Sequence, residues 1–349
     1  MERKITIRDV AKYAGVSVAS VSNVLNNKNK VSEETKKSIL QAIDDLGYQM
    51  DFTARSLSNK KSNLVGVVLP VTEKRLAASI LLRDNPYFAE FISGVDTYCK
   101  NKDYDMLMTA ISDTKTILAW VRKRNIDGVI FLGCLPKDIM EVLKKNRTPM
   151  IVIDNYDEDI DDITNIGIDE LKGGYLATKH LLDLGHKNIV FCGNDLDTMS
   201  VNGLRYQGYK LALEKYKVPF NQELTITADI TLTGGKEVVN KIINSQYDIT
   251  AIFCVGDILA LGVIKELNKL SLSVPEDYSV IGFDDLNICK YITPELTTVR
   301  QDIFKKGIRA GEAIIEEIEF NGSNEKIKEI MPINLVERGT TLQLKRNTV

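Results

Sequence analysis

Apolar and polar positions follow two different periods along this chain, and the change of period divides it. Between residues 6 and 46, apolar residues recur every three or four positions, which is the spacing of one helix face. From residue 64, short apolar runs alternate with amphipathic stretches, as in parallel sheets covered by helices. The pattern therefore predicts a small all-α head followed by an α/β body.

Two short helices joined by a tight turn are predicted at the start of the head. Thr6 stands at the N-cap of the first helix, Gly15 ends it, and Ser17 is placed to cap the second. The apolar positions of the two helices are Ile7, Val10, Ala11, Ala14, Val18, Val21, Val24 and Leu25. This arrangement favours a helix-turn-helix, whose second helix can enter the DNA major groove, with an ordinary helical hairpin as the alternative.

A third helix is predicted from its cap at Ser32 to Gly47, with two acidic residues in its first turn. A short segment at 52–57 and a polar, basic linker separate it from the first apolar strand. Residues 1–62 hold 11 Lys and Arg against 7 Asp and Glu, whereas the remainder holds 34 against 41. A small basic head on an acidic body is what a phosphate-binding module attached to a sensor would show.

Strands and helices alternate in the predicted body. The strands are expected at 64–69, 105–110, 128–132, 150–153, 189–192, 251–255 and 280–283. The helices are expected near 88–100, 115–124, 137–145, 170–184, 202–216, 234–245 and 257–268. Because about 285 residues exceed what one such sheet holds, we expect two doubly wound α/β lobes.

Composition indicates a globular protein, since 44% of the 349 residues are hydrophobic and 27% are charged. No apolar run reaches the length of a membrane span, and the first residues lead into the helical pattern rather than a signal peptide. Five scattered cysteines without a CxxC pair are interpreted as reduced thiols. We therefore expect a cytoplasmic protein without membrane association.

Enzyme signatures are mostly absent. The two histidines, His180 and His186, are six residues apart, which does not bring both to one helix face for a metal, so a structural role is favoured. Nucleophile-elbow, Walker A and dinucleotide-binding motifs do not occur in the sequence. Paired acids such as Asp284 and Asp285 are solvated by default. We expect no catalytic residue, no metal and no cofactor.

Four blocks of residues near the start of the chain carry a family resemblance. They are T-I-x-D-V-A-x-x-A-G-V-S at 6–17, V-S-x-V-L-N at 21–26, V-S-x-x-T at 31–35, and L-G-Y with A-R-x-L at 46–57. In these residues and their spacing the chain resembles the LacI/GalR (lactose-repressor) family of transcriptional regulators. The resemblance implies a helix-turn-helix DNA-binding domain at 1–49, a hinge helix and linker at 50–62, and an effector-binding and dimerisation domain at 63–349.

The resemblance also implies a periplasmic-binding-protein-like body, in which the chain crosses three times between two lobes. On that template, lobe one comprises about 63–160 and 294–324, and lobe two about 161–293 and 325–349. Further runs at 294–302 and 336–341 match family landmarks.

DNA-contacting residues follow from the same resemblance. Family members place base-contacting side chains where this chain has Val18, Ala19 and Asn23, and asparagine at the last position prefers adenine. Hydroxyl groups of the head are expected on phosphates, and Leu57 of the hinge helix is expected in the minor groove. The full set is Thr6, Ser17, Val18, Ala19, Ser20, Ser22, Asn23, Ala54, Arg55 and Leu57.

An effector site is expected in the interlobe cleft, where the strands of open α/β sheets end. Asp284 ends a strand and can accept hydrogen bonds from vicinal sugar hydroxyls, and Arg205 lies in a segment that resembles the family's effector-binding one. A turn cap and a plain salt bridge are the alternatives for these two residues. The full set is Tyr87, Phe88, Asn155, Asp169, Arg205 and Asp284, of which Asn155 and Asp169 are the weaker candidates.

The function implied is that of a sequence-specific transcriptional regulator, most simply a repressor, of double-stranded operator DNA. A palindromic operator calls for a homodimer, and the segment after Leu342 is too short for the leucine heptads of tetrameric relatives. A small sugar-like effector is expected to control DNA binding. Two alternatives stay open, namely control by a protein corepressor and a sugar-processing α/β enzyme.

Overall fold

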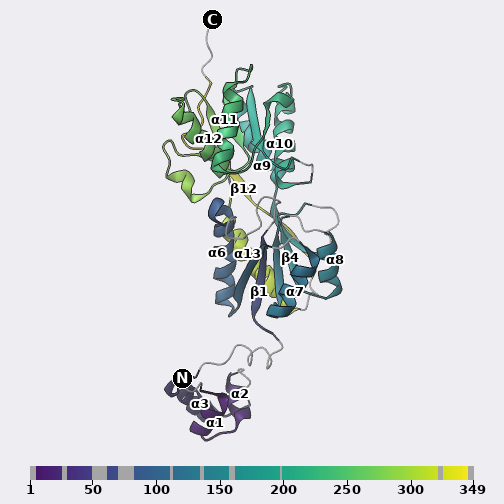
Figure 1. The fold of residues 1–349 in the computed structure, drawn as a ribbon, viewed down its shortest axis with the longest axis vertical. Helices are drawn as coiled ribbons and strands as arrows, with labels where there is room; N and C mark the ends of the chain where they lie inside the picture. The colour runs from purple at the N-terminus through teal and green to yellow at the C-terminus, as the bar shows by residue number, and fades with distance from the viewer. Residues whose placement is uncertain are drawn as a thin grey trace.

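The structure is a computed structural model that describes residues 5–25, 30–48, 61–69, 82–110, 113–133, 137–156, 162–196, 199–320 and 325–344. It contains a head of three helices and a body of two lobes, each built around one six-stranded sheet (Figure 1). This is the fold class that the two hydrophobic periods predicted. Within the ranges given, no helix is long and apolar enough to cross a membrane.

The head packs three short helices around a small core of its own. The helices are α1 (Ile7–Tyr13), α2 (Val18–Leu25) and α3 (Glu33–Asp45). The buried residues of this core are Val10, Ala11, Val21, Val24, Ile39 and Ala42. They come from all three helices, so the apolar stripes that the sequence predicted meet in one cluster.

Turn and cap residues fix where the helices of the head begin. Gly15 has φ +65°, in the left-handed region that favours glycine, and it reverses the chain between α1 and α2. The Ser17 hydroxyl accepts a hydrogen bond from the backbone N–H of Ser20 at 3.0 Å. The Ser32 hydroxyl likewise accepts from the backbone N–H of Thr35 at 3.2 Å. Both serines therefore act as N-caps.

Lobe one contains a fully parallel sheet in the order β11-β5-β4-β3-β1-β2. Its strands are β1 (Leu64–Leu69), β2 (Asp105–Ala110), β3 (Gly128–Leu132), β4 (Met150–Ile153), β5 (Thr164–Ile168) and β11 (Lys328–Met331). Its helices are α6 (Pro86–Asn101), α7 (Thr114–Arg124), α8 (Lys137–Lys145) and α13 (Ile303–Glu319). Val67 shares a core cluster with α6, whereas its neighbour Val68 shares one with α7 and α8. The sheet is therefore covered on both faces.

Lobe two contains a sheet in the order β12-β10-β9-β8-β6-β7, with only β12 antiparallel to its neighbour β10. Its strands are β6 (Ile189–Gly193), β7 (Thr225–Thr227), β8 (Ala251–Cys254), β9 (Ser279–Asp284), β10 (Thr297–Gln301) and β12 (Ile333–Val336). Its helices are α9 (Glu170–Asp183), α10 (Val201–Lys215), α11 (Leu232–Ile243) and α12 (Asp257–Lys269). In Figure 1, α11 and α12 lie on one side of this sheet and α9 and α10 on the other.

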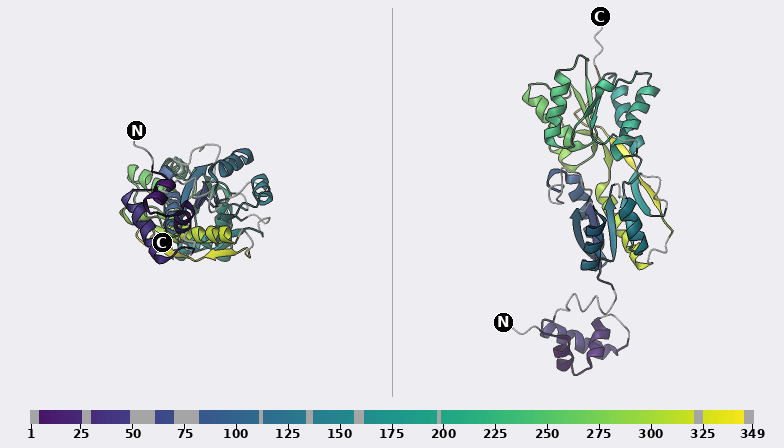
Figure 2. Two further views of the ribbon diagram at one scale, coloured as in Figure 1. Left: turned by 90° about the horizontal axis from the view of Figure 1, so that it is seen from below. Right: turned by 45° about the vertical axis from the view of Figure 1, so that its right-hand side comes forward.

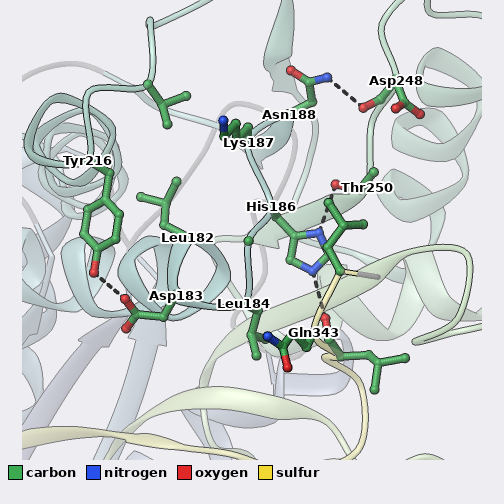
Figure 3. Close-up of a pocket in the computed structure, with 14 residues that line it drawn as sticks. Leu182, Asp183, Leu184, His186, Lys187, Asn188, Tyr216, Asp248, Thr250 and Gln343 are labelled. Atoms are coloured by element: carbon green, nitrogen blue, oxygen red, sulfur yellow. Dashed lines mark hydrogen bonds between the residues drawn. The ribbon is translucent and has the colours of Figure 1, made fainter. Parts of the chain in front are cut away.

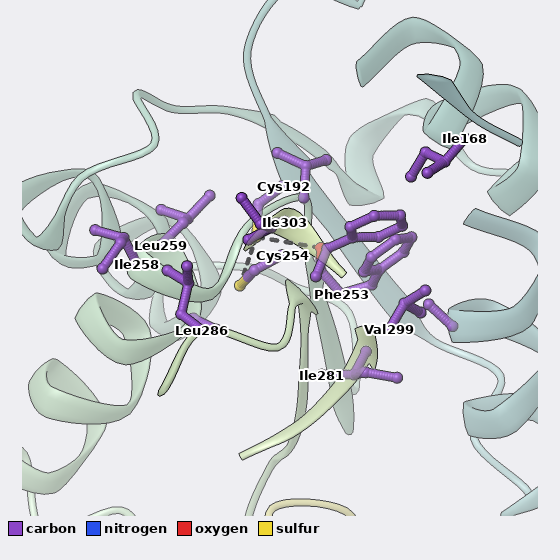
Figure 4. Packing of buried hydrophobic residues seen from close by; sticks show 14 of the residues in the cluster. Ile168, Cys192, Phe253, Cys254, Ile258, Leu259, Ile281, Leu286, Val299 and Ile303 are labelled. Atoms are coloured by element: carbon purple, nitrogen blue, oxygen red, sulfur yellow. Dashed lines mark hydrogen bonds between the residues drawn. The ribbon is translucent and has the colours of Figure 1, made fainter. Parts of the chain in front are cut away.

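Cysteines contribute to the core of lobe two. Cys192 on β6 and Cys254 on β8 are paired across neighbouring strands, and their sulfur atoms are 3.3 Å apart (Figure 4). These two, together with Cys99 and Cys289, are buried free thiols. They pack as small apolar residues.

The three crossings between the lobes differ in place from those expected. Strand β5 pairs with β4, so lobe one extends to residue 168 rather than 160. Strand β10 pairs with β9, so 297–301 belongs to lobe two. Residues 328–331 pair with β5 in lobe one, and only β12 returns to lobe two (Figure 2). The expected lobe boundaries are corrected accordingly, because hydrogen-bonded pairing assigns each short strand to its sheet.

Glycines let α9 and α10 approach each other closely. A Cβ atom on Gly174 would lie 2.0 Å from the carbonyl oxygen of Arg205. A Cβ atom on Gly208 would lie 2.1 Å from the carbonyl oxygen of Leu171. Both distances are too short for a side chain, so these positions set the separation of the two helices.

We predict that Gly174→Ala lowers the unfolding midpoint of the protein. The added methyl group meets backbone rather than a flexible side chain, and such overpacking costs about 1–3 kcal/mol. The midpoint is measured by circular dichroism in a denaturant titration. Glu214→Ala, at an exposed position on α10, is the control and should change it little. An unchanged midpoint in Gly174→Ala would contradict the close packing described here.

Candidate ligand pocket and nucleic-acid interface

A cavity of about 260 Å³ lies between the two lobes, at the carboxyl ends of strands from both sheets. Its volume is slightly below the range of about 300–1,000 Å³ that is usual for ligand sites, which fits a small ligand. The residues that line it are Asn85, Tyr87, Phe88, Leu132, Gly133, Asp154, Val201, Asn202, Arg205, Ile230, Val255, Gly256, Asp284 and Gln301. Four of the six predicted effector residues are among them.

A buried lysine joins the two lobes beneath this pocket. The Lys306 side chain, on α13, is fully buried, and its Nζ donates to the two carboxylate oxygens of Asp154 at 2.8 and 2.9 Å. The same Nζ donates to Oε1 of Gln301 at 2.7 Å. Gln301 Nε2 in turn donates to Oδ1 of Asp284 at 2.6 Å. A chain of hydrogen bonds therefore runs from the end of β4 in lobe one to the end of β9 in lobe two.

Arg205 is held by a second buried ion pair on the lobe-two side. Its Nε donates to Oε2 of Glu170 at 2.6 Å, and both side chains are almost fully buried. Its Nη1 donates to the carbonyl oxygen of Val255 at 2.5 Å. Its guanidinium lies 3.5 Å from the centre of the Phe283 ring, a cation–π arrangement. Arg205 therefore forms a salt bridge and also lines the pocket, and its effector-binding role stays a prediction.

Asp284 is a carboxylate in an unusual place. It is buried, and its φ of +116° is a backbone conformation that residues with side chains rarely adopt. Burial raises the pKa of Asp284 to about 8, the charge of Arg205 opposes this shift, and the charge of Asp257 adds to it. Asp284 does not cap a turn in the described hydrogen bonds; it accepts from Gln301 and faces the pocket.

An aromatic pair forms the lobe-one wall of the pocket. The rings of Tyr87 and Phe88 lie 5.5 Å apart, edge to face. The Tyr87 hydroxyl donates to Oδ2 of Asp154 at 2.7 Å, and burial, followed by the charge of Asp154, raises the pKa of Tyr87. Asn85 caps α6 by accepting from the backbone N–H of Tyr87 at 3.0 Å, which fixes where the pair projects.

Two predicted effector residues lie outside the pocket lining. Asp169 is exposed and caps α9, where its side chain accepts from the backbone N–H of Lys172 at 2.9 Å. Asn155 is buried, and its carbonyl oxygen accepts from Nδ2 of Asn165 at 2.6 Å. Both predictions are corrected here: the first residue serves a helix end, and the second lies one position beyond the pocket-lining Asp154.

Several polar residues of the site were not predicted from the sequence. They are Asn85, Asp154, Glu170, Asn202, Gln301 and Lys306. Asp154 directly follows β4, so the strand-end argument applied to Asp284 would have found it. Lys306 was detectable in another way, because it stands at helical spacing between the buried Ile303 and Ala310 on an apolar face.

A larger cavity, of about 1160 Å³, lies near the C-terminal end of the described chain (Figure 3). His186 contributes to it, but its ring bonds to the Thr250 hydroxyl at 2.9 Å and to the carbonyl oxygen of Leu342 at 3.0 Å. His180 bonds to the Thr341 hydroxyl at 2.9 Å. Both histidines join the last segment to lobe two, a structural role. The buried ion pairs described above belong to the interlobe pocket, which is therefore the candidate site.

The described residues that are predicted to contact DNA lie on helix α2 and at the N-caps of α1 and α2. Val18 and Ala19 are exposed at the start of α2, and 43% of the Val18 surface is accessible although the residue is apolar. Asn23 is half-buried one turn further along α2. Thr6 and Ser17 are exposed at the ends of α1 and α2, whereas Ser20 and Ser22 are half-buried. Ala54, Arg55 and Leu57 lie outside the described residues, so their predicted roles stay predictions.

Comparison with known proteins bears on both parts of the molecule. Residues 6–51 match the model of bacterial regulatory proteins of the lacI family, and residues 178–341 match a periplasmic binding protein-like domain. The HTH-type transcriptional repressor PurR of Photorhabdus laumondii is 33% identical over 95% of this chain and 96% of its own length. This chain belongs to the lacI family. A PurR repressor of Histophilus somni is 32% identical to this lacI-family protein over 94% of the chain and 96% of its own length.

Solved structures of lacI-family regulators share the fold. The lac repressor dimer bound to operator and the anti-inducer ONPF has a TM-score of 0.82 and 25% identity, over 97% of this chain and all of the other. A LacI family transcriptional regulator of Enterococcus faecium with bound ribose has a TM-score of 0.70 and 28% identity, over 81% of this chain. The protein is thus a DNA-binding transcriptional regulator of the repressor type, a class that does not consist of enzymes. Among the described residues, no group of three or more potential ligands could hold a metal ion.

The titration of Asp284 gives a pH-dependent prediction. Because its pKa is raised from 3.8 to about 8, the folded protein holds this proton more tightly than the unfolded chain. The resulting stabilisation is fully present below about pH 4 and is lost as the pH rises through about 8. We expect the thermal unfolding midpoint of the parent to decrease as the pH is raised from 5 to 9. In Asp284→Asn this decrease should be less steep. Asp248→Asn, at an exposed position, should follow the parent, and equal slopes for all three proteins would contradict the assignment.

Proposed function

We propose that this lacI-family repressor binds a palindromic operator as a homodimer and that a sugar or sugar derivative in the interlobe pocket controls its affinity for DNA. The observation that carries the effector proposal is the pocket itself. Its lining combines an aromatic wall from lobe one with Arg205 and Asp284 from lobe two. Hydroxyl groups of a sugar can donate to the carboxylate and accept from the guanidinium, and an apolar sugar face can stack on the aromatic pair.

The DNA side of the proposal rests on helix α2. Its exposed start presents Val18 and Ala19, and Asn23 lies on the same helix. An asparagine can bond to the N6 and N7 edge of adenine, whereas small apolar side chains contact the thymine methyl group. The exposed hydroxyls of Thr6 and Ser17, beside two helix N-termini, are suited to phosphates. One head reads one half-site, so a two-fold dimer suits a palindromic site.

Coupling between pocket and head is proposed to use the crossings between the lobes. Glu170 lies directly after the first crossing and Gln301 directly before the second, and both belong to the buried polar networks. A ligand that contacts Asp284 and Arg205 would change the partners of both residues. The ligand therefore favours one arrangement of the lobes over another. The free energy by which it changes DNA binding is set by the difference between its binding free energies for the two arrangements.

The first test concerns base readout. Asn23→Ala is expected to weaken binding to a selected operator by about 5- to 150-fold, since a base contact contributes ~1–3 kcal/mol. The operator is first obtained by selecting randomised duplex DNA with the purified protein at physiological salt, and affinity is then measured by fluorescence anisotropy. Gln41→Ala on α3 is the control and should bind like the parent. Unchanged affinity in Asn23→Ala would contradict the role of this residue.

A second test separates effector control from DNA binding. Phe88→Ala should retain operator affinity but need at least tenfold more sugar for the same response, because the sugar loses an aromatic partner. The response is measured as the change in operator affinity over a panel of pentoses, hexoses and disaccharides. The control is Phe220→Ala, an exposed aromatic outside the pocket lining. If Phe88→Ala responds like the parent, the ligand does not occupy this pocket.

The two alternatives give different results in these experiments. A protein corepressor in place of a sugar would produce a response to cell extract and none to the sugar panel. A sugar-processing enzyme would consume the bound sugar, which chromatography of the mixture after incubation would detect. The matches to PurR repressors along 94–95% of the chain favour the regulator over the enzyme.

A further inference from the structure

The charges of the pocket also limit the kind of ligand it can take. This inference rests on the sugar-controlled function proposed above and specifies the effector more closely. We infer that the pocket selects an uncharged sugar-like effector and excludes the phosphorylated form of the same sugar. The cations of the site are already paired with carboxylates of the protein.

Each cation of the described site has a carboxylate partner within the protein. Lys306 bonds to both oxygens of Asp154, and its whole side chain is buried. Arg205 bonds to Glu170 at 2.6 Å, and both side chains are buried as well. A phosphate entering the pocket would have to compete with these carboxylates, and displacing either one would leave a buried carboxylate without a counter-charge.

The third carboxylate of the described site forms no ion pair of its own. Asp284 accepts from the neutral amide of Gln301, and the positive charge that stabilises its ionised form is that of Arg205, which is bonded to Glu170. The described site thus carries two cations and three carboxylates. When Asp284 is protonated, the net charge of these five groups becomes zero, but it does not become positive. In neither state does the site offer an unpaired cation to an anionic ligand.

Helix N-termini would favour an anion, but groups of the protein already lie at those of the described pocket. Helices α6, α10 and α12 begin there. Helix α12 has no side-chain cap, and the buried carboxylate of Asp257 stands in its first turn. The N–H of Tyr87 is bonded to the side chain of Asn85, and the N–H of Gly203 is bonded to the side chain of Ser200. A helix N-terminus corresponds to about half a positive charge, and three carboxylates lie at or beneath the pocket. The partial charges therefore stabilise side chains of the protein itself.

Neutral polar groups of a ligand neither compete with the buried carboxylates nor are repelled by them. A ligand hydroxyl can donate to Asp284, which keeps a lone pair beyond the one used by Gln301. The guanidinium of Arg205 has five N–H donors, and the bonds described above use Nε and Nη1. The remaining donors can bond to a hydroxyl or ring oxygen without disturbing Glu170. An uncharged polyol thus gains both contacts and leaves both ion pairs intact.

The test measures binding of matched neutral and phosphorylated sugars to the full-length protein by isothermal titration calorimetry. The pairs are D-ribose with ribose 5-phosphate, D-glucose with glucose 6-phosphate, D-galactose with galactose 6-phosphate, and D-fructose with fructose 6-phosphate. We expect at least one neutral sugar to bind and its phosphate to bind about 100-fold more weakly or not at all. A phosphate that binds as tightly as its neutral partner, or more tightly, would overturn the inference while leaving sugar control in place.

Variants of Asp284 connect the selectivity to the residue. The affinities are compared at pH 9, above the pKa of about 8, where the Asp284 carboxyl is ionised. In Asp284→Asn, the charge that repels a phosphate is gone but a neutral acceptor remains, so the ratio of the affinity for the neutral sugar to that for its phosphate should fall by about tenfold. Asp248→Asn removes an equal charge from an exposed position and should keep the parental ratio. An unchanged ratio in Asp284→Asn would contradict the role given to this carboxylate. If no sugar of either form binds, the proposed sugar control is wrong, and this inference is wrong with it.

Discussion

Charged side chains are buried where the two sheets meet, and this constraint governs the arrangement of the elements around them. A buried ion without a partner costs several kcal/mol, so each one requires a counter-charge from another segment. Asp154, after β4, obtains it from Lys306 on α13, and Glu170 on α9 obtains it from Arg205 on α10. The glycine contact between α9 and α10 brings the second pair together. The helices that carry these residues cannot shift independently.

Binding specificity follows from the same constraint. A pocket whose cations are already paired recognises its ligand through hydrogen-bond geometry and apolar contact rather than through charge. In the proposed function, the aromatic pair of lobe one would supply the contact, and Arg205 and Asp284 of lobe two would supply the hydrogen bonds. Because the two kinds of wall belong to different lobes, recognition and the relative position of the lobes are linked. This is the arrangement that a regulator needs and that a rigid carrier would not need.

Most of the periodic elements were predicted from the sequence, but helix α13 and the short strands with polar residues were not. The predicted strand at 64–69 matches β1 because all six residues are buried and apolar. The pattern missed β5 and β10, in which threonine or asparagine side chains are buried by tertiary pairing. In the site, strand-end reasoning found Asp284 but chose Asn155 over Asp154, since sequence alone does not say which of two neighbours faces a cleft. Lys306 was missed because helix α13 was not predicted.

The order of the strands has a consequence for how the chain is made. The sheet of lobe one is completed by β11, which follows almost all of lobe two in the sequence, and the sheet of lobe two is completed by β12, which follows β11. During synthesis from the N-terminus, both sheets therefore keep an unpaired edge strand until β11 and β12 have been made. Such long-range pairings slow folding and leave exposed edges that can associate. The head, whose core is formed within residues 7–48, has no such delay and can fold first.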